Sequence, residues 1–391
     1  MKVNAWSRLG FDFNPFEHLE ASEDPRLGLY LVERAGLAHI WEEVPAVLYA
    51  KSGAGKTALR MQTERLCWSR PYSGPLPVTY LLSPSSLESG YPAVNDHYRA
   101  MNEAVARSLF ISILLCPTRF LRADKKTQGE LASWLDRLLP ARISHYIKRM
   151  ESDGTTRSVI GHFDRNQLFA VPTHSPHLLA DFLPRLKDSS FRVQSDAEPA
   201  RLFQHLTEIA LHDLGFRSIF LLVDGLDGTP ETYLNPSAGY QWLAPLWEDV
   251  DQLTDERVYF KEFFPSEMDL SSYAPALSSL WTFSLQWTVP TLAQMLRKRI
   301  YVASGGRFGS LDAISAPILR DVETQMVRLC TSDLPREQLR FADMVLNQLV
   351  SKKEEMPRLL LDDLLLVKTI YESEEIAMGI VDTTPVTELA I

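Results

Sequence analysis

Five short apolar runs, separated by longer stretches of mixed polarity, predict β-strands. They lie at 45–49, 78–82, 218–223, 257–264 and 280–287. The third run, SIFLLV, is continuously apolar, which is typical of a strand buried on both faces of a parallel sheet. A proline-free stretch from Thr57 predicts a helix between the first two strands. Because strands alternate with helices, the pattern favours an α/β fold with a doubly wound parallel sheet.

Helical spacing dominates two further parts of the chain. Residues 84–200 carry helical patches at 101–115 and 129–150, followed by an irregular part with several glycines and prolines, and we interpret them as a large, mainly helical insertion. After Pro290 the chain predicts helices only, which indicates a C-terminal helical lid. The expected divisions are 1–83 for the lead-in and first part of the core, 84–200 for the insertion, 201–288 for the second part of the core, 289–353 for the lid and 354–391 for an acidic tail.

The composition narrows the class of protein. A net charge of −10 disfavours a large nucleic-acid surface, which needs concentrated lysine and arginine. Three widely spaced cysteines indicate neither a disulfide framework nor a thiolate metal cluster. The longest apolar runs fall well short of the roughly 18 residues that span a bilayer. The N-terminus lacks the apolar core and cleavage site of a signal peptide, so we expect a cytoplasmic protein.

A phosphate-binding loop is indicated by residues 50–57, AKSGAGKT. They match the pattern GxxxxGK[ST] except that alanine stands at the first glycine. The two remaining glycines allow backbone N–H groups to turn into one concavity, and the helix that follows directs its positive end at the phosphates. By their order in the loop, Lys56 is expected to contact the β- and γ-phosphates and Thr57 to bind Mg²⁺. The residues expected to bind ATP or ADP are Ser52, Gly53, Ala54, Gly55, Lys56, Thr57 and Ala58.

A second string, IFLLVDGLD at 219–227, is an apolar strand that ends in a carboxylate. Alone, an apolar strand before Asp-Gly also fits a simple β-turn. With a phosphate-binding loop upstream, Asp224 is expected to be the acid on the Mg²⁺ side of the site, acting directly or through a bound water.

Several strings resemble one known family. VDGLD is similar to the extended Walker B motif of NACHT-like members of the STAND class, which are regulatory, AAA+-related P-loop ATPases. That resemblance implies that Asp224 holds Mg²⁺ and that Asp227 positions the attacking water. DLPREQLRFADMVL at 333–346 resembles the GxPR helix start of these proteins, which implies that Arg336 reaches the γ-phosphate as a sensor. The strings at 11–27 and 287–304 resemble their lead-in and their arginine-bearing helical segment.

The resemblance implies a slow ATPase that works as a nucleotide-dependent assembly or signalling switch, in the manner of bacterial conflict systems, with a second copy or a separate effector as partner. The consecutive cations Arg297, Lys298 and Arg299 fan around a predicted helix, so at least one is expected to point outward toward a neighbour. Two alternatives stay open. One is a DNA-associated AAA+ ATPase, which the acidic tail disfavours, and the other is a scaffold that binds nucleotide without turnover.

Overall fold

A five-stranded parallel sheet lies at the centre of the chain in this computed structural model, which describes residues 5–32, 40–82, 91–188, 197–227, 232, 235–267, 280–330 and 332–377. The strand order is β2-β3-β4-β1-β5, and every pair is parallel. The strands are β1 (Ala46–Ala50), β2 (Leu76–Leu81), β3 (Ile219–Asp224), β4 (Val258–Pro265) and β5 (Trp281–Ser284). All five predicted strands are confirmed, although β5 ends earlier than its apolar run.

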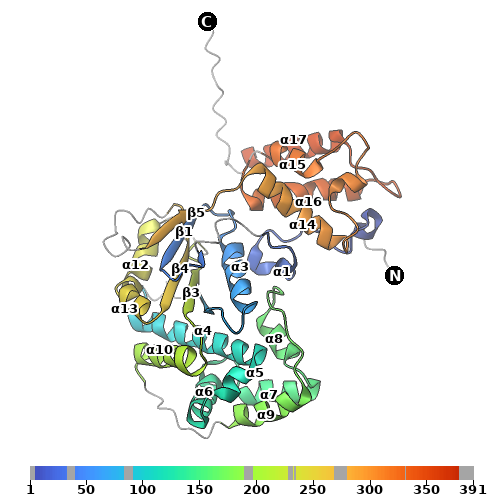
Figure 1. The fold of residues 1–391 in the computed structure, drawn as a ribbon. Helices are drawn as coiled ribbons and strands as arrows, with labels where there is room; N and C mark the ends of the chain where they lie inside the picture. Colours follow the sequence, from blue (N-terminus) through green and yellow to red (C-terminus); the bar gives the residue numbers. More distant parts are fainter. Residues whose placement is uncertain are drawn as a thin grey trace.

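Helices cover both faces of the sheet, so the predicted doubly wound α/β arrangement is confirmed. Alternate residues of β3 point to opposite faces: Phe220 and Leu222 pack in one core with α3 (Lys56–Trp68), and Leu221 and Val223 pack in the other. In Figure 1 the strands lie between α3 on one side and α12 and α13 on the other. The second face is covered by α4 (Val94–Leu115), α10 (Pro199–Glu208), α12 (Pro236–Trp247) and α13 (Val250–Asp255).

The insertion between β2 and β3 is helical over more of its length than predicted. Residues after Gly154, expected to be irregular, form two helices. Gly154 has a φ of 63° and caps the end of the helix before it, and Ser175 caps the start of the helix that begins at Pro176, so these turn residues mark helix boundaries. The helices between α4 and α10 are α5 (Pro117–Arg122), α6 (Lys125–Leu138), α7 (Ile143–Asp153), α8 (Arg157–Phe163) and α9 (Pro176–Lys187).

A helical bundle with its own core follows the sheet. Its helices are α14 (Val289–Ala303), α15 (Val322–Leu329), α16 (Pro335–Ser351) and α17 (Leu361–Ala377). The predicted boundary at 353 is wrong, because Leu364, Val367 and Tyr371 of α17 share the core of the other three helices. The boundary of the first segment also changes, since Leu9 and Phe16 pack in this core and not in the sheet. Residues 378–391 of the predicted tail lie outside the described residues.

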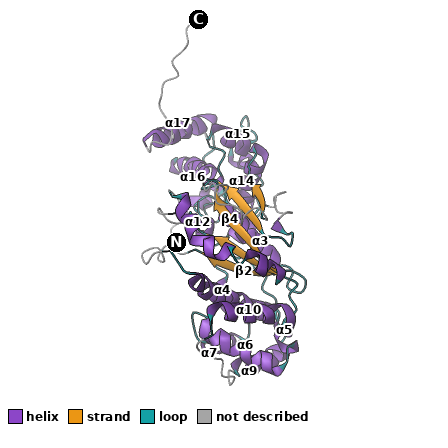
Figure 2. Cartoon of the chain, turned by 90° about the vertical axis from the view of Figure 1, so that its left-hand side faces the viewer, coloured by secondary structure: helices purple, strands orange, loops and turns teal. Residues whose placement is uncertain are grey.

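The bundle and the insertion lie at opposite ends of the sheet (Figure 2). The lead-in passes between bundle and sheet and includes the single-turn helix α1 (Leu27–Tyr30), which packs against both α14 and α3. No helix within the described ranges combines the length and the apolar character needed to cross a membrane.

Candidate functional site

The carboxyl ends of β1 and β3 meet at one edge of the sheet, with β4 between them. The chain leaves β1 toward α3 on one face and leaves β3 toward α12 on the other face. Where parallel strands send their connections to opposite faces, the carboxyl edge opens into a crevice, which is where such sheets bind ligands. The two strings singled out in the sequence, 50–57 and 219–227, are therefore brought together.

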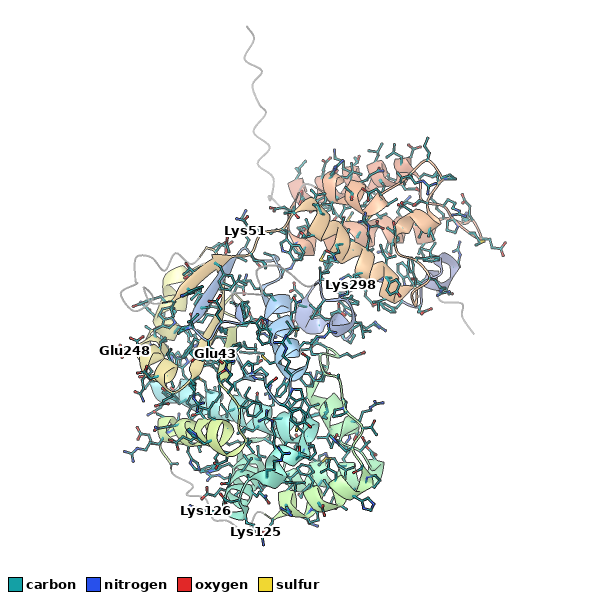
Figure 3. The ribbon with its side chains drawn as sticks, in the orientation of Figure 1. Glu43, Lys51, Lys125, Lys126, Glu248 and Lys298 are labelled. Atoms are coloured by element: carbon teal, nitrogen blue, oxygen red, sulfur yellow. The ribbon has the colours of Figure 1, made fainter. Side chains whose placement is uncertain are left out.

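The loop after β1 has the backbone expected of an anion cradle. Gly53 and Gly55 have φ values of 79° and 90°, in the left-handed region that favours glycine, and α3 begins at Lys56. Ala50 is not among the described residues with positive φ, which explains why alanine is accommodated at the first glycine position. Lys51, the first residue of the loop, is exposed and lies on the side of the sheet nearest the bundle (Figure 3).

Lys56 is 4% exposed and its ammonium group has three partners. Nζ donates to Ala50 O at 3.1 Å and to Lys51 O at 3.2 Å, and it lies 2.7 Å from Asp227 Oδ2. An ammonium has three donors, so all of them are used. Two residues predicted to act on the γ-phosphate, Lys56 and Asp227, are thus in direct contact.

Asp224 is 2% exposed, and its carboxylate contacts an arginine that the sequence did not suggest. Oδ2 accepts from Arg60 Nε at 3.0 Å, and Oδ1 accepts from the backbone N–H of Gly225 at 2.9 Å. Arg60 also donates to Glu64 Oε2 at 3.1 Å. Arg60 stands four positions after Lys56, one helical turn along α3, and Glu64 follows at the same spacing. The four-residue spacing of Lys56, Arg60 and Glu64 was the sequence pattern that could have linked Arg60 to the site.

Arg336 lies over the loop at the first turn of α16. Its backbone N–H donates to Gly53 O at 3.2 Å, and its Nη1 donates to Ser52 Oγ at 3.3 Å. Its Nη2 pairs with Glu20 Oε1 at 2.7 Å. The loop is also held by Trp287, whose indole N–H donates to Ala54 O at 2.8 Å. One arginine therefore joins the bundle, the loop and the lead-in.

The consecutive cations of α14 all have partners inside the chain, but Arg297 is 38% exposed, so the expectation that one points outward to a neighbour stays a prediction. Arg297 pairs with Asp321 and with the buried Glu323, and Lys298 donates to Leu31 O, on the side of the bundle that faces the lead-in (Figure 3). These contacts form because α14 packs against α1 and α15, which bring Leu31, Asp321 and Glu323 beside it.

Arg299, the third cation, forms a buried cluster with the lead-in. Its Nη2 lies 3.2 Å from Asp24 Oδ2, and its guanidinium stacks 4.4 Å from the centre of the Tyr30 ring. The Tyr30 hydroxyl donates to the same Asp24 carboxylate, and burial raises the pKa of this hydroxyl above its ordinary value. This cluster fixes the lead-in against α14 beside the site.

One cavity of about 430 Å³ collects these groups between the sheet edge, the lead-in and the bundle. Its polar lining includes Glu20, Ser22, Tyr30, Ser52, Lys56, Thr57, Arg60, Gln62, Asp224, Asp227, Arg299 and Arg336. In the described part of the chain, no three His, Cys, Asp or Glu side chains are grouped to hold a metal by themselves. The Thr57 hydroxyl and the Asp224 carboxylate are oxygen donors of the kind Mg²⁺ prefers, and they fit an ion that phosphate oxygens help to hold. Comparisons of the chain with protein-family models, curated proteins and solved structures found no match.

Proposed function

We propose that this chain is a P-loop ATPase of STAND-like type that works as a nucleotide-dependent switch. One observation carries the proposal. A single cavity is lined by Lys56 from the loop after β1, by Asp224 and Asp227 from the end of β3, and by Arg336 from the helical bundle. These are the cation, the two acids and the second cation that phosphoryl transfer requires around a triphosphate.

Each residue has a role in this proposal that follows from its place. The loop N–H groups and Lys56 bind the phosphates, and Thr57 and Asp224 hold Mg²⁺, which neutralises phosphate charge. The role of Asp227 in this proposal is to position the water that attacks the γ-phosphate, and its contact with Lys56 supports that role. Arg336 meets the charge that develops on the transferred group.

The switch follows from the contacts of Arg336. Its guanidinium bridges Ser52 and Glu20, so a γ-phosphate bound at the loop competes with Glu20 for the same cation. Because Arg336 belongs to α16, the nucleotide state then sets the relation between the bundle and the sheet. A cytoplasmic setting and a second copy or a separate effector as the partner belong to the same proposal.

Light scattering with Mg-ATP, with a non-hydrolysable analogue and with ADP tests the switch. We expect the mass of the particle to be larger with the first two ligands than with ADP, alone or with a co-purifying partner. A constant mass in all three states contradicts a role in assembly.

The buried pair between Arg60 and Asp224 favours a second candidate, a scaffold that binds nucleotide without turnover, because the metal-side acid already has a cation partner. Single-turnover hydrolysis by the wild type and by Asp227→Asn separates the two. The ATPase predicts measurable turnover that falls by about tenfold or more in the variant while ATP binding persists. Equal turnover in both proteins removes the catalytic role of Asp227.

A further inference from the structure

Gln62 of α3 is a buried polar residue that the roles proposed above do not use. It is 5% exposed, and its side chain lines the same cavity as the phosphate-binding loop. Within the described part of the chain, no side-chain or backbone group forms a hydrogen bond with its amide. Buried polar side chains are normally hydrogen-bonded, so an amide that faces a cavity without a protein partner points to a ligand.

The position of Gln62 relative to the loop defines which part of a ligand it meets. Six residues of helix place it about 9 Å along α3 from Lys56. It stands one turn beyond Ala58 on the same side of the helix, so a molecule held by its phosphates at the loop and extended along this side brings its other end to the amide. Gln62 is therefore expected to contact the end of the ligand that lies farthest from its phosphates.

Two apolar residues line the first cavity beside Gln62. Leu31 and Val32 are 7% and 8% exposed and line the cavity beside it. The same three residues also line a second cavity of about 380 Å³, so the two spaces adjoin at Gln62. The first cavity therefore offers apolar side chains and one amide to the end of a ligand, whereas the second cavity is also lined by the polar residues Ser69, Gln294 and Lys298.

We propose that Gln62 is the residue that selects the base of the bound nucleotide, and that it selects adenine over guanine. The amide offers a donor and an acceptor side by side, which matches the N6 donor and N7 acceptor of adenine. The corresponding edge of guanine presents two acceptors, O6 and N7, which leave the amide oxygen without a donor. This inference rests on the proposed function, since it requires a nucleotide whose phosphates occupy the loop.

Calorimetric titrations of the full chain with Mg-ATP, Mg-GTP and inorganic tripolyphosphate test the assignment. The wild type should bind ATP at least tenfold more tightly than GTP. Gln62→Leu should lose about tenfold in ATP affinity and keep its affinity for tripolyphosphate, which has no base. Gln62→Glu should weaken ATP binding without improving GTP binding, because a carboxylate repels N7 of adenine and both acceptors, O6 and N7, of guanine.

Gln128 on α6 provides a matched control. It is also a buried glutamine, 4% exposed, but its amide donates to Ala123 O at 2.7 Å. Gln128→Leu should therefore lower the Tm without changing any ligand affinity, whereas Gln62→Leu should leave the Tm of the free chain unchanged or raise it. If Gln62→Leu does not fold, Gln62→Met, which keeps the length of the side chain, replaces it.

Two results overturn the inference. One is unchanged ATP and GTP affinity in both Gln62→Leu and Gln62→Glu, and the other is a wild type that prefers GTP. Failure of the proposed function gives different results. If the wild type binds neither ATP nor tripolyphosphate, or if Lys56→Ala binds both as tightly as the wild type does, the loop is not a phosphate site.

Discussion

At the residue scale, the ion pair between Arg60 and Asp224 occupies the carboxylate that the proposed function assigns to Mg²⁺. Both side chains are nearly buried, with exposed fractions of 4% and 2%. Removing one partner of such a pair leaves a buried charge uncompensated, which typically costs about 3–5 kcal/mol of stability. In the proposed site Mg²⁺ is a second cation for the same carboxylate, so the arginine and the metal compete for it.

Arg60→Met is therefore expected to lower the Tm of the free chain and to increase the gain in Tm that Mg-ATP produces, because the metal then supplies the missing counter-charge. Differential scanning calorimetry with and without Mg-ATP measures both effects. Arg65→Met, on the same helix but outside the ion pair, is the control and should show the gain of the wild type. An equal gain in the Arg60 variant would argue against competition at Asp224.

The residues of the site that could be predicted from the sequence are those in continuous strings. Lys56, Asp224 and Asp227 each stand next to the strand or helix that positions them, so local order was enough. Arg60 meets Asp224 across 164 positions, and Glu20 meets Arg336 across 316. Such pairs depend on how the sheet closes and on how the bundle packs on it, which no local pattern records.

At the scale of single elements, the first turn of α16 is the part of the bundle that contacts the loop. Arg336 is partly exposed in this position, so its pair with Glu20 contributes little to stability, about 1 kcal/mol or less. We expect Arg336 to affect the hydrolysis of bound nucleotide instead.

Arg336→Ala should lower the ATP hydrolysis rate by about tenfold or more and change the Tm by only a few degrees. Arg340→Ala is the matched control on the same helix, since Arg340 pairs with Glu337 and Glu374 inside the bundle. It should leave hydrolysis unchanged. Steady-state phosphate release measures both rates, and equal rates in the two variants would remove Arg336 from the site.

Strand β4 carries a buried carboxyl that sets a pH dependence. Burial raises the pKa of Glu262 from 4.5 to about 8, against a hydrogen bond from the Trp247 indole at 2.8 Å. Between those pH values the folded chain keeps a proton that the unfolded chain has lost, so this group makes the free energy of unfolding fall as pH rises.

Glu262→Gln should remove that fall, so its stability relative to the wild type should increase from pH 4.5 to about 8 and then level off. Urea unfolding across this range measures the difference. The neighbouring Lys261, whose pKa burial lowers to about 7, is present in both proteins and cancels. A constant difference between the two proteins at every pH would contradict a raised pKa.

The elements that the sequence did not predict have particular physical causes. Helix α17 is apolar around most of its circumference, with Leu361, Leu365 and Ile370 exposed opposite its buried side, so no amphipathic stripe identified it as part of the bundle. Helices α8 and α9 are short and bounded by Gly154 and Pro176, and turn residues of this kind also occur in loops.

At the scale of the whole molecule, the lead-in contacts both the helical bundle and the sheet, whose relation the proposed switch would change. Leu9 and Phe16 lie in the core of the bundle, whereas Glu20 and Tyr30 line the cavity beside the sheet. The sheet edge, the lead-in and the bundle therefore all line this cavity. The proposed switch therefore depends on nucleotide binding at the loop.

The phosphate site is tested most directly by a calorimetric titration of the full chain with Mg-ATP, comparing the wild type with Lys56→Ala and Lys51→Ala. Lys56 is buried against the loop, and Lys51 is its exposed neighbour. We expect Lys56→Ala to weaken ATP binding by at least tenfold, about 1.4 kcal/mol, and Lys51→Ala to bind ATP as the wild type does. Unchanged affinity in Lys56→Ala would contradict a phosphate site at this loop and with it the proposed function.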